Sequence, residues 1–130
     1  MGLKRWDTPR ALHLLERVQG KRLEQLRNQI RWRLYRHPDE ELRAGFANHY
    51  RTRGVRSQAA RWGIVTPGWS TPEEVRELRH WLLGRFQGDD EVRQLLCLPA
   101  HHPLPPEVAD LADPAFRSRG RERVTGASGC

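Results

Sequence analysis

The sequence predicts an all-α fold: a compact bundle of about five helices, built on a long basic N-terminal helix and followed by an irregular proline-rich C-terminal segment. Three observations support this prediction. Apolar residues recur at helical spacing, helix start and stop signals flank those stretches, and no stretch alternates convincingly as a strand would. A length of 130 residues suits one domain, which we place at residues 1–116, and the composition of residues 117–130 indicates a flexible tail.

The predicted first helix extends from Thr8 to His37. Thr8 is expected to be its N-cap, with Pro9 in the first turn, and Pro38 ends the helix because proline disfavours helical geometry in the preceding residue. Its buried arc consists of Leu12, Leu15, Leu23, Leu26, Ile30 and Leu34. The opposite arc carries Arg10, Arg17, Lys21 and Arg31, with Trp32 and Tyr35 among them. Gly20 is the weak point, and a break there would leave two shorter helices.

A second helix is expected directly after the first. The acidic residues at 39–41 complement the dipole of its first turn, and Gly54 ends it. Its buried stripe consists of Leu42, Phe46 and His49. Gly45 would permit a close approach of another element.

The remaining helices are shorter. Residues 57–62 fit a third helix, and residues 71–74 form a capping box that opens a fourth, which extends to about Gln87. Another short helix is expected within residues 89–98. One last helix is suggested by Val108, Leu111 and Phe116. The connector at residues 99–106 contains four prolines and is expected to be irregular.

Positive charge is concentrated in the first half of the chain. The formal net charge is +7, but residues 1–62 contain 15 Lys and Arg against 6 Asp and Glu, whereas residues 63–130 contain 8 against 10. Of the 23 basic residues, 21 are arginine, which binds phosphate in a bidentate manner and stacks on bases. A GC-rich genome would explain the excess of arginine over lysine, but not the uneven distribution. We therefore expect the first half to face a polyanion and the second half to contact protein partners.

The basic surface of the first half is the candidate nucleic-acid-binding site. Its phosphate-contacting residues are expected to be Arg17, Lys21, Arg22, Arg27, Arg31, Arg33, Arg51, Arg53 and Arg56. Trp32 and Tyr35 are candidates for stacking on the bases of a single strand. The alternative, favoured by the usual burial of tryptophan, places both rings in a second packing face covered by another helix.

Residues 54–69 resemble a helix-turn-helix over a short stretch. Ala59, Gly63 and Ile64 match the small residue, the turn glycine and the apolar residue of that motif. The recognition helix would then have to include residues 66–72, where two prolines and a glycine oppose a helix. The match is too short to indicate a family, and it leaves a DNA-binding regulator as an alternative function.

The sequence contains no catalytic motif. Phosphate-binding, dinucleotide-binding, nucleophile-elbow and zinc-protease patterns are all missing, so we expect neither an enzyme nor a cofactor. Cys97, His101 and His102 are zinc-ligand types but lack a fourth ligand at a recognisable spacing. A core cysteine followed by exposed histidines explains them better, and a helical first turn explains the acidic residues 89–91 better than a magnesium site does.

Targeting and membrane signals are also missing from the sequence. The first ten residues contain no apolar run, and no window approaches the roughly 20 apolar residues of a membrane span. Two cysteines are too few for a disulfide framework. We therefore expect a soluble cytoplasmic protein with no membrane partner.

Together, these observations predict a small non-catalytic helical subunit that binds the nucleic-acid backbone within a ribonucleoprotein or DNA–protein assembly. In size, helical class and charge, the chain resembles the small subunits of CRISPR effector complexes, and also many phage and ribosome-associated proteins. One alternative is the helix-turn-helix-like DNA-binding regulator. Another is a phage structural or adaptor protein, or an inhibitor, whose arginines bind an acidic protein surface.

Overall fold

The computed structural model describes residues 5–85 and 88–112, and its regular elements are all helical. In chain order they are α1 (Thr8–Leu15), α2 (Gly20–Arg36), α3 (Glu40–Thr52), α4 (Arg56–Gly63), α5 (Pro72–Leu83), α6 (Asp89–Leu95), α7 (Pro106–Ala109) and the 3-10 helix η1 (Asp110–Ala112). No strand occurs within those two ranges, so the all-α prediction is confirmed.

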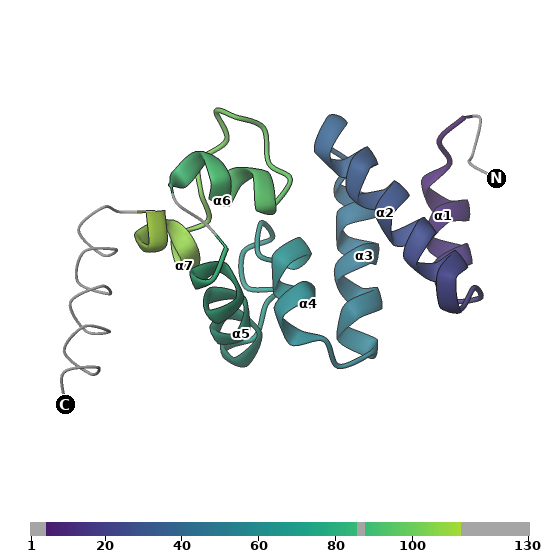
Figure 1. Cartoon of the computed structure of the whole chain (residues 1–130), viewed down its shortest axis with the longest axis horizontal. Coiled ribbons are helices and arrows are strands. Elements are labelled where there is room, and N and C mark those ends of the chain that lie inside the picture. Colours follow the sequence, from purple (N-terminus) through teal and green to yellow (C-terminus); the bar gives the residue numbers. More distant parts are fainter. Residues whose placement is uncertain (1–4, 86–87, 113–130) are drawn as a thin grey trace.

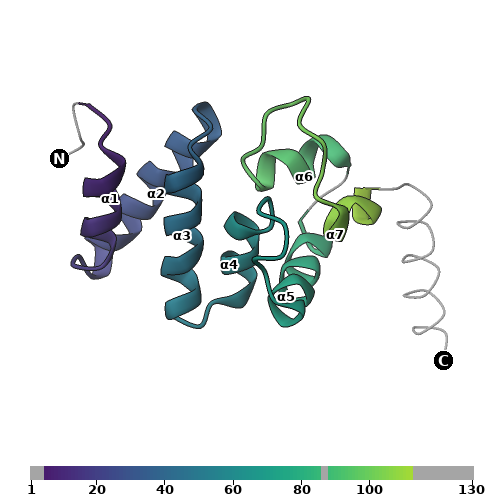
Figure 2. The same ribbon diagram turned by 180° about the vertical axis from the view of Figure 1, so that it is seen from behind.

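The helices follow one another along the long axis of the molecule. Figure 1 shows α1, α2 and α3 packed together at one end, α4 in the middle, and α5, α6 and α7 toward the other end. The view from behind in Figure 2 shows the same order, with α4 between α3 and α5. Most of the basic first half of the sequence therefore lies toward one end of the molecule.

The expected single helix from Thr8 to His37 is wrong, because it is divided into α1 and α2. The first of these helices ends at Leu15 and the second begins at Gly20. Gly20 has a φ of +63°, in the left-handed region that glycine adopts without a Cβ clash. The second helix therefore begins at Gly20, the residue that the sequence indicated as the weak point of a single long helix. The break reverses the chain, so that α1 and α2 can both pack on α3.

Asp7, and not Thr8, is the N-cap of α1. Its carboxylate accepts a hydrogen bond from the backbone N–H of Arg10 at 3.0 Å. Thr8 is already helical, and its hydroxyl donates to the carboxylate of Asp39 at 2.6 Å. Since Asp39 is the N-cap of α3, this hydrogen bond joins the first turns of α1 and α3.

Two apolar clusters hold the helices together, and α4 contributes to both. The first cluster joins α1, α2 and α3 to Ala59 and Trp62. The second joins α5, α6, α7 and η1 to Ala60 and Ile64. The neighbouring residues Ala59 and Ala60 of α4 belong to different clusters, because they lie about 100° apart around the helix, and α4 therefore separates the two clusters.

Local signals located the next helices well. Asp39 accepts a hydrogen bond from the backbone N–H of Leu42 at the start of α3, and the expected stripe of Leu42, Phe46 and His49 is buried. A Cβ at Gly45 would lie 2.4 Å from the side chain of Leu12, which confirms the expected close approach.

Both hydrogen bonds of the predicted capping box are present at the start of α5. That helix ends at Leu83, earlier than expected, because Gly84 follows and glycine is a weak helix former.

The proline-rich connector packs better than its composition suggested. Pro105 is buried and Leu104 is half-buried against the second cluster. Val108 and Leu111 are fully buried, as expected for a last short helix. Phe116 and the expected tail at residues 117–130 lie outside the described residues.

Candidate nucleic-acid interface

The outer face of α2 combines aromatic, amide and basic side chains. The helix buries Leu26, Ile30 and Leu34 against the first cluster. Opposite this buried stripe, the exposed side chains are Lys21, Gln25, Asn28, Gln29, Trp32, Tyr35 and Arg36. We call this set the α2 outer face. With the rise and turn of an α-helix, these residues form one continuous strip about 25 Å long. Arg22 and Glu24 are exposed at the two edges of the strip.

Trp32 and Tyr35 are the most exposed large apolar side chains in the described residues. Trp32 is 61% exposed and Tyr35 is 55% exposed. The interpretation that another helix covers both rings is therefore wrong. Their ring centroids lie 6.1 Å apart and the ring planes meet at 79°, in an edge-to-face pair. Two flat surfaces at a right angle are thus presented to solvent.

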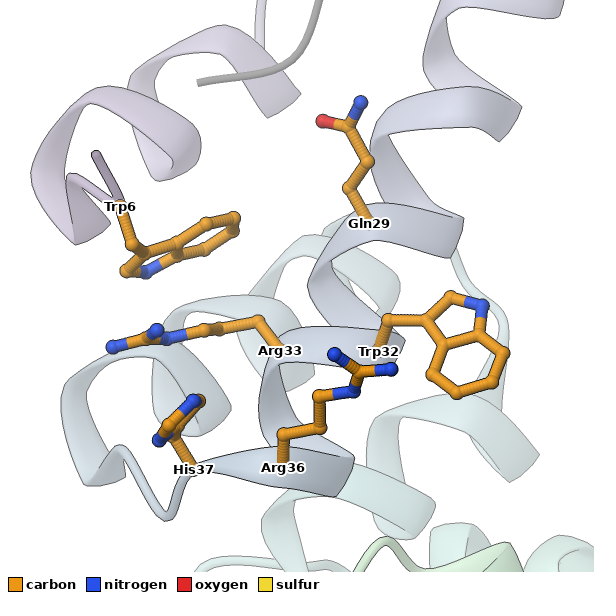
Figure 3. A pocket seen from close by; sticks show the side chains of 6 residues that line it. All are labelled: Trp6, Gln29, Trp32, Arg33, Arg36 and His37. Carbon is orange, nitrogen blue, oxygen red and sulfur yellow. The ribbon is translucent and has the colours of Figure 1, made fainter. Parts of the chain in front are cut away.

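Two arginines are positioned by aromatic rings beside this pair. The guanidinium of Arg36 lies 5.6 Å from the centroid of Trp32, and that of Arg33 lies 5.5 Å from the centroid of Trp6. Trp6 comes from the segment before α1, so α1 brings this ring to the side of α2 (Figure 3). The rings orient the guanidinium groups without occupying their in-plane N–H donors.

A hollow of about 450 Å³ opens between these groups. Its lining residues are Trp6, Gln29, Trp32, Arg33, Arg36 and His37 (Figure 3). None of the described lining residues is acidic. The Nε of Arg33 is buried and has no hydrogen-bond partner among the described residues. The guanidinium groups of Arg33 and Arg36 line the hollow, and guanidinium groups donate readily to anionic oxygens.

Only some of the sequence-predicted phosphate contacts are oriented toward solvent. The exposed residues of the predicted set are Arg17, Lys21, Arg22, Arg53 and Arg56. Arg27, Arg31 and Arg33 are half-buried at the edge of α2. Arg27 donates to Glu24 at 2.6 Å and to His49 at 3.1 Å, whereas Arg31 contacts Asn28 and lies 3.5 Å from the hydroxyl of Tyr50. These internal contacts make Arg27 and Arg31 weaker candidates than the sequence suggested.

Arg51 stabilises the fold. Its guanidinium donates to both carboxylate oxygens of Glu74, at 2.8 and 2.5 Å, and to the carbonyl of Trp69 at 2.8 Å. It also stacks on the ring of Trp69 at 3.5 Å. The hydrogen bond from Arg51 holds the pKa of the Glu74 carboxyl below its usual range, and the same bond raises the pKa of Arg51. Arg51 therefore joins α3 to α5 and is left out of the interface.

His49 lies under the basic edge of α2. Its side chain is buried, with Nε2 accepting from Arg27 and Nδ1 lying 2.9 Å from Arg53 and 3.5 Å from Glu16. Burial, and then the neighbouring charge of Arg53, lower the pKa of His49. Arg53 also lies 3.7 Å from Glu16. Arg27 and Arg53 thus serve partly to hold α1, α2 and α3 together around a neutral imidazole.

Two further arginines lie in the centre of the molecule, where Arg43 is buried and Arg61 is half-buried. Arg43 donates to the carbonyl of Cys97 at 2.7 Å, and Arg61 donates to the carbonyl of Leu95 at 2.6 Å. Both guanidinium groups lie over Trp62, at 5.6 and 4.4 Å from its centroid. Burial lowers the pKa of Arg43, and it lowers the pKa of Arg61 to about 10, so Arg61 remains charged at neutral pH.

Sequence reasoning missed the contribution of Trp6, Asn28, Gln29, Arg36 and His37 to this surface. For Arg36 a signal was available, because it follows Trp32 by four residues and so lies on the same helical face. Asn28 precedes Trp32 by four residues and was available in the same way. Trp6 had no such signal, since its position depends on the reversal between α1 and α2.

The other candidate sites receive less support. Residues 64–71 contain no helix, so the recognition helix of a helix-turn-helix at residues 66–72 is not formed.

Cys97 is buried, as expected, and burial raises the pKa of its thiol. Within residues 5–85 and 88–112, no three His, Cys, Asp or Glu side chains are grouped for metal binding. No helix in the described part of the chain is long and apolar enough to span a membrane.

Comparisons with known proteins add no assignment to this geometry. No family model, no curated protein and no solved structure matches the chain.

Proposed function

We propose that this protein is a small non-catalytic subunit that binds single-stranded nucleic acid through the α2 outer face, within a ribonucleoprotein or DNA–protein assembly. The observation that carries the proposal is the exposure of Trp32 and Tyr35 beside the arginines of the hollow. Exposed flat rings with adjacent cations are the two elements with which proteins hold single strands.

Electrostatics supports the same surface. Residues 1–62 carry an excess of basic over acidic residues, 15 against 6. Lys21 and Arg36 lie on the α2 outer face, and Arg17 and Arg22 are exposed near its N-terminal end. These cations can neutralise phosphates along a strand that follows α2.

Exposed aromatic rings favour a single strand over a duplex. The bases of a duplex are stacked on one another, so their faces cannot reach Trp32 or Tyr35. A single strand can turn its bases toward the protein, and each base stacked on an aromatic ring contributes about 1–3 kcal/mol. Duplex binding through the same cations would leave the two rings without a role.

We assign protein partners to the second half of the chain. Residues 63–130 contain 8 basic against 10 acidic residues and so offer no comparable attraction for phosphate. Such a subunit would bind a nucleic-acid strand at one end and other protein subunits of the assembly at the other end. It would act like the small subunits of CRISPR effector complexes, which the chain resembles in size, helical class and charge.

An adaptor or inhibitor that binds an acidic protein surface is the second candidate. Trp32, Tyr35 and Arg36 are also the residue types enriched at the energetic centres of protein interfaces, and this observation favours it. A sequence-specific DNA regulator has less support, because the second helix of its motif is not formed.

A titration separates these functions. Fluorescent 12-nucleotide single strands and 12-base-pair duplexes of DNA and RNA are titrated at 50 and 200 mM salt. We expect single strands to bind more tightly than duplexes, with an affinity that falls steeply with salt and depends little on sequence. No single-strand binding at 50 mM salt would reject the proposal in favour of the acidic-surface adaptor.

Charge reversal locates the site. Arg22→Glu with Arg36→Glu should weaken single-strand binding by at least about tenfold, because two phosphate contacts become repulsive. The matched control is Arg76→Glu with Arg85→Glu, which changes the charge equally at exposed positions of the second half. Equal losses in both variants would show a diffuse attraction and would contradict the placement on α2. The helical CD spectrum checks that each variant is folded.

A further inference from the structure

Three hollows lie in series across the α2 outer face. The first, of about 450 Å³, and the second, of about 250 Å³, share Trp32 as a lining residue. The second and the third, of about 370 Å³, share Tyr35. The hollows are therefore neighbours, divided from one another by the two exposed aromatic rings.

The first hollow suits a nucleotide with its phosphate. Arg33 and Arg36 supply guanidinium donors, and Trp6 and Trp32 supply ring surfaces. The carboxamide of Gln29 lies at one side of the hollow (Figure 3). A carboxamide donates and accepts, so it can pair with the edge of a base.

The second hollow is a narrower site between the two dividing rings. Its lining residues are Asn28, Arg31, Trp32, Tyr35 and Cys97. Because the rings are nearly perpendicular, a base that stacks on one of them meets the other at its edge. Asn28 places a second carboxamide within this site.

The third hollow lies between Tyr35 of α2 on one side and α6 with the segment after it on the other. Its lining residues are Tyr35, Asp90, Arg93, Gln94, Leu98, Pro99 and Ala100. Asp90 introduces a carboxylate here, which lies 3.5 Å from the guanidinium of Arg93, whereas the first two hollows have no acidic lining residue. A carboxylate accepts from the exocyclic amino groups of bases, so it favours a base edge at this position.

We infer that the α2 outer face is a track for three consecutive nucleotides of a single strand, one in each hollow, with Trp32 and Tyr35 as dividers. The inference rests on the proposed function and adds a site size and a register to it. The strand is held most strongly at the Trp6 end, where the two arginines bind phosphate. Further nucleotides contact only the exposed cations around the track.

A length series tests the site size. Unlabelled oligodeoxycytidylates and oligocytidylates of one to six nucleotides, whose bases carry an exocyclic amino group, compete with a labelled 12-nucleotide strand at 50 mM salt. Affinity should rise steeply with each nucleotide up to three, because each adds a base in a hollow. Beyond three nucleotides the gain per nucleotide should be small. A uniform gain from one to six nucleotides would overturn the track, while binding of the 12-nucleotide strand would leave the proposed function standing.

Substitution of the dividers tests the register. Trp32→Ala and Tyr35→Ala should each weaken binding of the trinucleotide by about tenfold, whereas Trp32→Phe and Tyr35→Phe should retain it within about threefold, because a flat ring remains. Leu83→Ala is the matched control, since Leu83 is 52% exposed on α5, and it should change nothing.

The outcomes separate the two proposals. Salt-dependent binding that Trp32→Ala leaves unchanged would mean contact with the backbone alone, and the track would be rejected. Failure of the 12-nucleotide strand to bind at all would reject the proposed function and the track with it. Thermal unfolding of each variant shows whether a lost affinity reflects a lost fold.

Discussion

Arginine–aromatic pairs occur in two regions of this molecule with opposite surroundings. At the α2 outer face, Arg36 lies over Trp32 and faces solvent. In the centre, Arg43 and Arg61 lie over Trp62, which is fully buried. The residue types and their spacing to the rings are alike, with centroid distances of 5.6, 5.6 and 4.4 Å.

The regions differ in burial and in what lies opposite the guanidinium groups. The central arginines donate to the carbonyls of Leu95 and Cys97, at the C-terminal end of α6, where unpaired carbonyls and the helix dipole both favour a cation. Two charges from α3 and α4 thereby anchor α6. At the α2 outer face, Arg36 is exposed and packs on Trp32, so its guanidinium faces solvent. An arginine that donates to carbonyls inside the fold is structural, whereas an exposed one is available for a ligand.

The largest expected effect comes from the buried tryptophan. Trp62→Ala should lower the free energy of unfolding by about 3–5 kcal/mol, because it leaves a cavity beside Phe46 and removes the ring beneath the guanidinium groups of Arg43 and Arg61. Trp32→Ala should change it by less than about 0.5 kcal/mol. Urea denaturation measures both. Similar decreases in the free energy of unfolding for the two variants would contradict the difference between the buried and the exposed region.

Loss of the ion pair between α3 and α5 should have an intermediate effect. Arg51→Ala should cost about 2 kcal/mol, because Glu74 is only 4% exposed and would remain charged without its main partner. Arg22→Ala, at an exposed position, is the control and should cost less than about 0.5 kcal/mol. If Arg51→Ala left the free energy of unfolding unchanged, Arg51 would again be a candidate for phosphate contact.

His49 should make stability depend on pH. The folded protein lowers the pKa of His49, so the unfolded chain binds a proton at higher pH than the folded one does. The stabilisation that comes from the neutral form of His49 is therefore fully present above about pH 6.5. As the pH falls toward 5, the free energy of unfolding decreases by less than about 1.4 kcal/mol per pH unit. Denaturation between pH 7.5 and 5 should show a flatter profile for His49→Gln. The exposed His80→Gln should retain the wild-type slope.

The smallest effect concerns single cations around the track. Lys21→Ala should make the plot of log affinity against log salt shallower by about 0.7 for a single strand, the value of one phosphate contact. Arg76→Ala on α5 should leave that slope unchanged. An unchanged slope in Lys21→Ala would move the strand away from the N-terminal end of α2.

Local signals account for the parts of the fold that sequence reasoning predicted. The cap at Asp39 and the capping box from Thr71 to Glu74 each satisfy backbone groups within three residues, so neighbours in sequence suffice to define them. Helical periodicity also places Lys21, Trp32 and Tyr35 on the side of α2 opposite its buried stripe, although it does not decide whether another helix covers them.

The division between α1 and α2 was less certain from sequence. Gly20 marked a weak point, but a glycine inside a helix costs only about 1 kcal/mol, and packing can outweigh that cost. Contacts of both helices with α3 stabilise the reversal instead. The position of Trp6 beside Arg33 follows from that reversal, and so does the first hollow.

The sequence by itself determined the helical class, the capping box of α5 and the positions of the basic and aromatic residues around α2, because these depend on neighbours within one or two turns. Only the tertiary structure decided which arginines are available. Arg43 finds its carbonyl 54 residues away and Arg51 finds one 18 residues away, and no local pattern records such acceptors. Tertiary packing also left Trp32 and Tyr35 uncovered, because burial of a helical face depends on what the rest of the chain places against it.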